Sequence, residues 1–71
     1  MSIRDLMDQG VQIQGTFQIK EWNDKEELYI ILAEGQDFEY EYHKINEDIL
    51  DKEIKYMYVP QIVSCIIFEV V

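Results

Sequence analysis

The run from Ile54 to Val71, IKYMYVPQIVSCIIFEVV, decides the fold of this 71-residue chain. Thirteen of its eighteen residues are apolar or aromatic, and only Lys55 and Glu69 are charged. β-Branched and aromatic side chains favour a pleated strand over a helix, so this composition predicts two buried strands. Pro60 and Gln61 mark the turn between them. Because proline suits no tight two-residue hairpin, we expect a wider loop there.

The second of these strands, Ile62–Val70, carries an expectation of its own. An apolar strand with a free edge can pair with other chains and aggregate. Glu69 is the only charged residue of this strand that would oppose such pairing. We therefore predict that the strand is paired on both sides within the sheet or forms the seam of a dimer.

Residues 1–71 are predicted to form a single small domain. A domain of this length buries only about 60% of its unfolded surface and often needs disulfides, a metal or a partner subunit. The single cysteine, Cys65, excludes an internal disulfide, and the single histidine, His43, disfavours a structural zinc site within one chain. Close packing or self-association remains as the source of stability, and a homodimer is therefore one expectation.

Capping signals predict two short helices. Ser2 is a good N-cap with Asp5 three residues later, and Gly10 suits the left-handed residue that ends a helix. Asn46 is a second N-cap that is followed by two acids, which predicts one or two helical turns.

Three strands are predicted between these helices. The first, Val11–Lys20, alternates apolar and polar residues around Gly15. The second, Leu28–Ala33, is apolar at both odd and even positions. The third, Phe38–Tyr42, alternates aromatic and acidic residues. With the two C-terminal strands, they predict a mainly β, small α+β fold. We expect a five-stranded curled antiparallel sheet or a small OB or SH3-like barrel, with a short N-terminal helix and a one- to two-turn helix between strands three and four.

The net charge of −9 lies entirely between Glu21 and Glu53, where twelve acids stand against three lysines. Binding to a phosphate backbone needs a basic footprint, so nucleic acid is disfavoured as a partner. The first residues show no basic segment followed by an apolar one, and no uninterrupted apolar window of about 18 residues occurs, so we expect neither a secretory leader nor a membrane helix. We therefore expect a cytoplasmic protein with no membrane association.

No residue pattern points to catalysis, a cofactor or a metal. Ser64 and Cys65 lie inside the most apolar strand, where cysteine is usually a small buried hydrophobe. Asn23–Glu27 lacks the glycine and the ligand spacing of a calcium loop. Glu39 and Glu41, spaced about 7 Å apart along a strand, are typical of solvent-facing carboxylates. We predict that the protein is not an enzyme and has no catalytic residue, cofactor or metal site.

Aromatic residues next to acids give the candidate partner-binding site. Tryptophan and tyrosine exceed what so small a core encloses, so some of them should reach the surface. We select Trp22, Glu39, Tyr40, Glu41 and Tyr42, because aromatics anchor protein interfaces and nearby charges steer encounter. The predicted function is a non-catalytic cytosolic protein-interaction or accessory module, which binds a partner with a basic face or a second copy of itself.

Two other functions stay open. Acids concentrated between residues 21 and 53 would suit a DNA mimic that inhibits a DNA-binding protein, if the carboxylates follow phosphate positions on one face. A small barrel with aromatic platforms would suit single-stranded nucleic acid, although such proteins also need a basic groove.

Several segments of the chain resemble a known group of proteins. They are the opening IRDLMDQGVQIQG, the turn WNDKEE, and the run LDKEIKYMYV with the terminal IIFEVV. These segments resemble small acidic uncharacterised proteins of Gram-positive bacteria and their mobile elements. The resemblance covers most of the chain and implies a bacterial cytosolic context, but it implies no activity and no functional residue.

Overall fold

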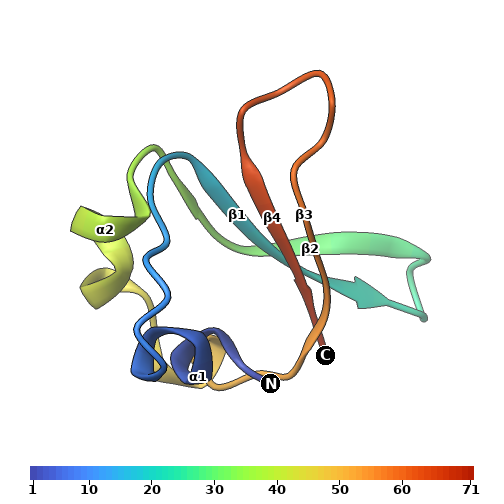
Figure 1. Cartoon of the computed structure of the whole chain (residues 1–71). Coiled ribbons are helices and arrows are strands. Elements are labelled where there is room, and N and C mark those ends of the chain that lie inside the picture. Colours follow the sequence, from blue (N-terminus) through green and yellow to red (C-terminus); the bar gives the residue numbers. More distant parts are fainter.

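The computed structural model describes the whole chain, residues 1–71, as three short helices beside a four-stranded sheet (Figure 1). In chain order the elements are α1 (Ile3–Asp8), β1 (Phe17–Asn23), β2 (Leu28–Gly35), α2 (Phe38–Glu41), the 3-10 turn η1 (Tyr42–Lys44), α3 (Glu47–Leu50), β3 (Ile54–Tyr58) and β4 (Ile66–Val70). None of the helices has the length and apolar character needed to span a bilayer.

The strands form one open, mixed sheet in the order β2-β1-β4-β3. β1 runs parallel to β4, with Phe17 opposite Ile66 and Glu21 opposite Val70, while β2 and β3 run antiparallel to their neighbours. A parallel pair needs a long crossover, and here the crossover contains β2, α2, α3 and β3. The chain therefore forms both edge strands of the sheet on its way from one central strand to the other.

β4 is paired on both sides, by β1 and by β3, which confirms the prediction made for the last strand. It is shorter than predicted, since it begins at Ile66 rather than at Ile62. The wide loop expected at Pro60 extends to Cys65 and carries Ile62, which is 95% exposed.

The predicted five-stranded antiparallel sheet or small barrel is wrong. Residues 38–42, predicted as the third strand, form α2 and the start of η1, and the sheet is four-stranded, mixed and not closed. The first strand also differs, because β1 begins at Phe17 and the preceding residues 11–16 are irregular. Gly15 in this segment has a φ of +85°, a conformation that glycine adopts at no steric cost.

Local contacts explain why residues 38–42 are helical. Phe38 and Tyr42 are four residues apart, so a spacing that suits alternate strand positions also suits one helix face, and their rings stack with centroids 5.9 Å apart. At the start of the helix, the Glu41 carboxylate accepts hydrogen bonds from the N–H of Gln36 (3.0 Å) and of Asp37 (2.8 Å). These bonds satisfy N–H groups that have no partner within the helix.

Both predicted helix starts are present. Ser2 Oγ accepts a hydrogen bond from the Asp5 N–H (3.1 Å), and the Asp5 carboxylate accepts one from the Ser2 N–H (3.0 Å), which completes a capping box. Asn46 Oδ1 accepts from the Asp48 N–H at 2.8 Å. Gly10, just after α1, has the left-handed conformation expected of it, with a φ of +88°.

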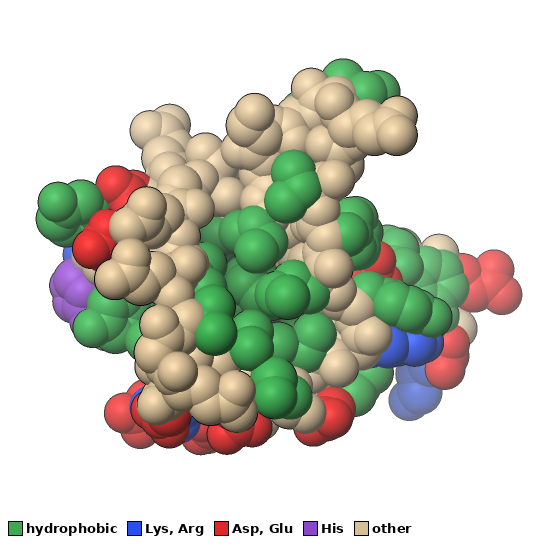
Figure 2. Space-filling model, in the orientation of Figure 1, with side chains coloured by type: hydrophobic (Ala, Val, Ile, Leu, Met, Phe, Trp, Pro, Cys, Tyr) green, Lys and Arg blue, Asp and Glu red, His purple; other side chains and the backbone are tan.

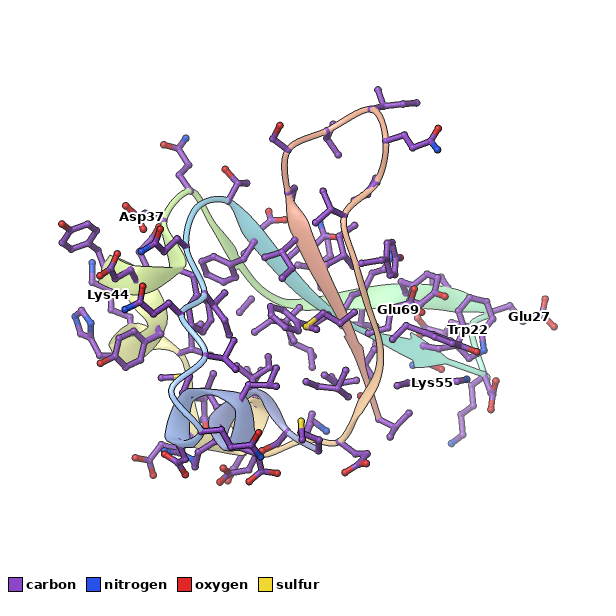
Figure 3. All side chains as sticks on the ribbon, viewed as in Figure 1. Trp22, Glu27, Asp37, Lys44, Lys55 and Glu69 are labelled. Carbon is purple, nitrogen blue, oxygen red and sulfur yellow. The ribbon has the colours of Figure 1, made fainter.

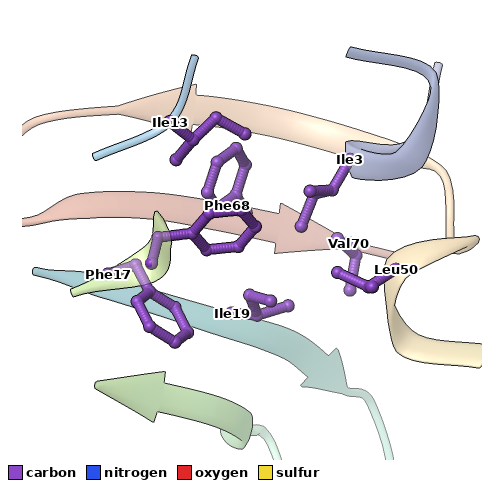
Figure 4. Close-up of a cluster of buried hydrophobic side chains, with 8 residues drawn as sticks. Ile3, Ile13, Phe17, Ile19, Leu50, Phe68 and Val70 are labelled. Atoms are coloured by element: carbon purple, nitrogen blue, oxygen red, sulfur yellow. The ribbon is translucent and has the colours of Figure 1, made fainter. Parts of the chain in front are cut away.

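One hydrophobic core lies between the sheet and the three helices (Figure 4). Its members are Ile3, Ile13, Phe17, Ile19, Phe38, Leu50, Phe68 and Val70. The ring of Phe38 packs edge-on against Phe17, with centroids 5.1 Å apart, and its centroid lies 6.4 Å from that of Phe68. The helices therefore cover only one face of the sheet.

The two chain termini meet the start of β3 at one end of the molecule (Figure 1). The Ile54 N–H donates to the Met1 carbonyl (2.8 Å), and the Val71 N–H donates to the Glu53 carbonyl (3.0 Å). Ser2 forms an isolated antiparallel bridge with Glu53, whose carboxylate also accepts from the Met1 ammonium group at 2.6 Å. Backbone hydrogen bonds therefore fasten α1 to the joint between α3 and β3.

Truncation of the central core residue is expected to destabilise the fold strongly. Phe68 is fully buried on a central strand, so Phe68→Ala should lower the free energy of unfolding by about 3–5 kcal/mol, which is close to the whole stability of a domain this small. Urea unfolding followed by circular dichroism measures the change. Tyr40→Ala, at a side chain that is 72% exposed, is the control and should stay within about 0.5 kcal/mol of the wild type. Equal stability of the two variants would contradict the core assignment.

Candidate interaction surface on the open face of the sheet

The face of the sheet opposite the core is not covered by any helix. The strand registers place ten side chains on this face, which we call the open face. They are Gln18, Lys20, Trp22, Tyr29, Ile31, Glu34, Tyr56, Tyr58, Ile67 and Glu69. Ile67 is buried beneath its neighbours, whereas Trp22, Tyr29, Tyr56 and Tyr58 are all exposed. The exposed aromatic residues of the sheet are thus gathered on one surface.

Glu69 lies near the centre of the open face and is held by two tyrosines. Tyr29 of β2 donates from its hydroxyl to Oε1 at 2.7 Å, and Tyr58 of β3 donates to Oε2 at 2.6 Å. Because β1 lies between β2 and β4, the Tyr29 side chain reaches across β1. Lys20 of β1 is opposite Glu69, and its Nζ lies 4.2 Å from the centroid of the Tyr29 ring. This network joins all four strands.

Hydrogen bonds set the protonation states in the network. The bond from Tyr58 lowers the pKa of Glu69, partial burial opposes this effect, and the bond from Tyr29 and the charges of Lys20 and Lys55 reinforce it. The same bond to Glu69 raises the pKa of Tyr58 to about 12, and its counterpart raises the pKa of Tyr29. At neutral pH the carboxylate is therefore ionised and both tyrosines keep their protons.

A shallow hollow of about 430 Å³ lies beside this network. It is lined by Trp22, Asp24, Tyr29, Lys55, Tyr56, Glu69, Val70 and Val71. The Trp22 ring packs edge-on against Tyr29 with centroids 5.0 Å apart, and its Nε1–H donates to Asp24 Oδ1 at 2.6 Å. Figure 3 shows Trp22, Lys55 and Glu69 in the same part of the sheet, away from α2. Contacts on the protein therefore orient the tryptophan before anything binds.

The hydrogen bonds of Glu69 make this carboxylate unsuited to proton transfer. Both carboxylate oxygens of Glu69 are engaged by tyrosine hydroxyls and its pKa is lowered, so it is a poor general base. No group of three or more histidine, cysteine, aspartate or glutamate side chains is placed to hold a metal ion. The open face offers four exposed rings, and the polar ends of three of them, Trp22, Tyr29 and Tyr58, are already paired.

The structure separates the residues that the sequence selects as the site. Trp22 lies on the open face near the end of β1, whereas Glu39, Tyr40 and Glu41 lie in α2, and Tyr42 begins η1. Figure 3 shows Trp22 on the far side of the sheet from the helical segment. Only Trp22 therefore joins the aromatic surface.

The other four selected residues lie together around α2. Glu41 is half-buried and engaged in the helix start, and Tyr42 stacks on Phe38. Glu39 and Tyr40 are exposed. The predicted alternation of aromatic and acidic faces is absent here, because the segment is helical.

Sequence reasoning does not find the network of Tyr29, Tyr58 and Glu69. The three residues come from three strands, and their contact depends on the β2-β1-β4-β3 order, which no local pattern specifies. One signal was present, because Glu69 is the only acid in the apolar C-terminal run. A carboxylate taken partly out of water needs donors, and tyrosines on the neighbouring strands were the available ones.

Neutralising Glu69 should lower the pKa of Tyr58. In Glu69→Gln the acceptor is no longer charged, so the Tyr58 hydroxyl should titrate nearer the ordinary tyrosine value of about 10 than its present value of about 12. Ultraviolet absorbance of tyrosinate during a pH titration measures this change. Glu34→Gln, at an exposed carboxylate that contacts Gln18, is the matched control and should leave the Tyr58 titration in place. An unchanged titration in Glu69→Gln would show that the hydrogen bond is absent in solution.

The same hydrogen bond should make stability depend on pH. The folded pKa of Tyr58 is raised. Its contribution to the free energy of unfolding is therefore complete below about pH 10 and is lost as the pH rises through about 12. The folded pKa of Glu69 is lowered, so its contribution is present above the ordinary value of 4.5 and is lost as the pH falls through the folded value. Tyr58→Phe should therefore flatten the alkaline loss of urea-unfolding free energy. Parallel alkaline profiles for the wild type and the variant would contradict this.

Comparison with known proteins identifies no relative. No family model matches the chain, no curated protein is detectably similar to it, and no solved structure matches it. The resemblance to small acidic proteins of Gram-positive bacteria stays a prediction.

Proposed function

We propose that this chain is a non-catalytic, cytosolic protein-interaction module that uses its open face to bind a protein partner with a basic face. The observation that carries the proposal is the group of exposed rings on one uncovered face, Trp22, Tyr29, Tyr56 and Tyr58. Glu69 fixes two of them through their hydroxyls. Fixed aromatic side chains lose little conformational entropy on binding and are enriched among the residues that dominate binding energy.

The distribution of acids around this face favours a basic partner. The turn between β1 and β2 carries Asp24, Glu26 and Glu27 against Lys25, and Glu34 lies near the other end of β2. At the right of Figure 2, where Figure 1 places the turn between β1 and β2, acidic side chains lie beside hydrophobic ones. Acidic side chains at the rim of an interface attract a basic partner to the interface and stay in contact with water themselves.

Two other partners fit the open face less well. A second copy of the chain would bring together two molecules that each carry a net charge of −9. Single-stranded nucleic acid would meet the aromatic rings, but Lys20 on this face and Lys55 in the adjoining hollow lie beside the ionised Glu69 and do not form a basic groove.

A DNA mimic is the second candidate function, because the helical segments carry most of the net charge. Residues 1–10 and 37–53 hold nine of the fifteen acids against three of the six bases, which accounts for −6 of the −9. Figure 2 shows acidic side chains along the lower edge of the molecule, where Figure 1 places α1. A cationic DNA-binding cleft would contact this edge and not the open face.

Site-specific photo-crosslinking separates these possibilities. A photoreactive phenylalanine analogue is placed at Tyr56 on the open face, at Tyr40 on α2, or at Glu47 on α3, and each purified variant is irradiated in an extract of the cells that make the protein. Tyr56 and Tyr40 are both exposed tyrosines, so they form a matched pair. We expect a discrete protein adduct from position 56 only, with a yield that falls as salt is raised from about 0.05 M to about 0.5 M, because screening weakens attraction to a basic face.

The remaining outcomes contradict the proposal in different ways. An adduct from position 47 alone would favour the DNA mimic, and an adduct from position 40 alone would favour the α2 segment selected from the sequence. An adduct of twice the chain mass from position 56 would identify a second copy. Equal labelling at all three positions would indicate non-specific contact.

A further inference from the structure

β2 leaves one side of its backbone without a partner. In the sheet it pairs only with β1, since it is the first strand in the order β2-β1-β4-β3. None of the backbone hydrogen bonds made outside the regular elements involves Leu28–Gly35, and no side chain bonds to the backbone of this strand. The outward N–H and C=O groups of β2 therefore form a row that can pair with an added strand.

The features that usually protect an edge strand are largely missing from β2. Leu28–Ala33 contains no charge and no proline, and the side chains from Leu28 to Ile31 are all exposed. The other edge strand, β3, is shorter, carries Lys55 within it and has Pro60 two residues after its end. Lysine and proline are common devices against edge pairing, so the two edges differ in their readiness to accept a strand.

A bulge limits the free edge to the first half of β2. Ile19 lies opposite Ala33 and Lys20 lies opposite Ile31, which leaves Leu32 as the extra residue. Leu32 and Ala33 pack against the core. The regular, exposed part of the edge is thus Leu28–Ile31.

Side chains on both faces of this edge are apolar. The register places Tyr29 and Ile31 on the open face and turns Leu28 and Ile30 the other way. An added strand would therefore meet apolar neighbours at every position, which favours β-branched residues on both faces of that strand.

The charges around the edge identify the kind of strand that fits. Asp24–Gly35 carries four acids against Lys25, with Glu26 and Glu27 before the apolar stretch and Glu34 after it. A symmetric dimer through this edge would bring together two chains that each carry a net charge of −9, which opposes self-pairing. A strand with basic ends would instead be attracted by the acids before and after the apolar stretch.

We propose that the free edge of β2 binds an extended segment of the protein partner, apolar over about four residues and flanked by lysine or arginine, as an additional strand of the sheet. This inference rests on the proposed function and specifies the recognised part of the partner. Main-chain hydrogen bonds at Leu28–Ile31 supply the pairing, and the flanking acids select for basic ends.

Short synthetic peptides serve as probes of this edge. The test peptide alternates valine and threonine and carries two lysines at each end. One control peptide has glutamates in place of the lysines, and another has proline in place of a central valine. Nuclear magnetic resonance of the isotope-labelled protein follows the amide signals and their hydrogen exchange during each titration.

The lysine-flanked peptide should shift the amide signals of Leu28–Ile31 and slow their exchange. The glutamate-flanked peptide should bind at least about tenfold more weakly, because its ends are repelled, and the proline peptide should give no protection. Ile31→Lys, at a side chain that is 51% exposed, should weaken binding at least about tenfold. Met57→Lys, which makes the same charge change at an equally exposed position on β3, should bind like the wild type. Ile30→Lys repeats the test if Ile31→Lys disturbs the spectrum.

Several results would overturn the inference. Shifts centred on Ile54–Tyr58, equal binding of both flanked peptides, or equal weakening by Ile31→Lys and Met57→Lys would each exclude selective addition at β2. Concentration-dependent shifts at Leu28–Ile31 without peptide would assign the edge to a second copy. If no peptide binds while position 56 still yields its adduct, the edge inference fails and the proposed function stands. If the peptide binds and position 56 yields nothing, the open-face proposal fails instead.

Discussion

The parallel contact between β1 and β4 is the interaction on which the rest of the molecule depends. These two strands supply Phe17, Ile19, Phe68 and Val70, half of the buried core, from adjacent positions in one register. Parallel neighbours cannot be joined by a hairpin, so the chain must make a long excursion between them, and both edge strands and two of the helices form within it. The three short helices cover only one face of the sheet. The other face carries exposed aromatic rings, two of which, those of Tyr29 and Tyr58, are held by hydrogen bonds to Glu69.

Features that depend on near neighbours in the sequence were predictable. The capping box of Ser2 and Asp5, the cap at Asn46 and the left-handed glycine at position 10 each require only a few adjacent residues. The central place of β4 was also predictable, because so apolar a strand is stable only when both of its edges are paired. In each case the residues that carry the signal also make the contact.

Features that depend on distant partners were not predictable. Aromatic and acidic residues alternate over 38–42 as they would in a strand, yet burial of Phe38 against Phe17 and the engagement of Glu41 with the helix start favour a helix. Of the predicted site, Trp22 alone reaches the open face, because residues 39–42 belong to α2 and η1 and not to a strand. The tyrosines around Glu69 become neighbours only once β1 is inserted between β2 and β4. The order of the strands determines which side chains become neighbours, and no single segment of the sequence specifies that order.

The meeting of both termini at Glu53 has a consequence for connectivity. Residue 71 and residues 1–2 bond to Glu53 and Ile54, so a short linker would join the two termini. New termini could be placed in the exposed loop at Ile62. Such a circular permutant would run β4, α1, β1 in succession, with the two parallel strands separated by one helix. The loop closure needed to form the central pair would shrink from most of the chain to a single helix and its flanking segments. If that closure limits the folding rate, the permutant would fold faster than the natural order, and stopped-flow refolding would measure the difference.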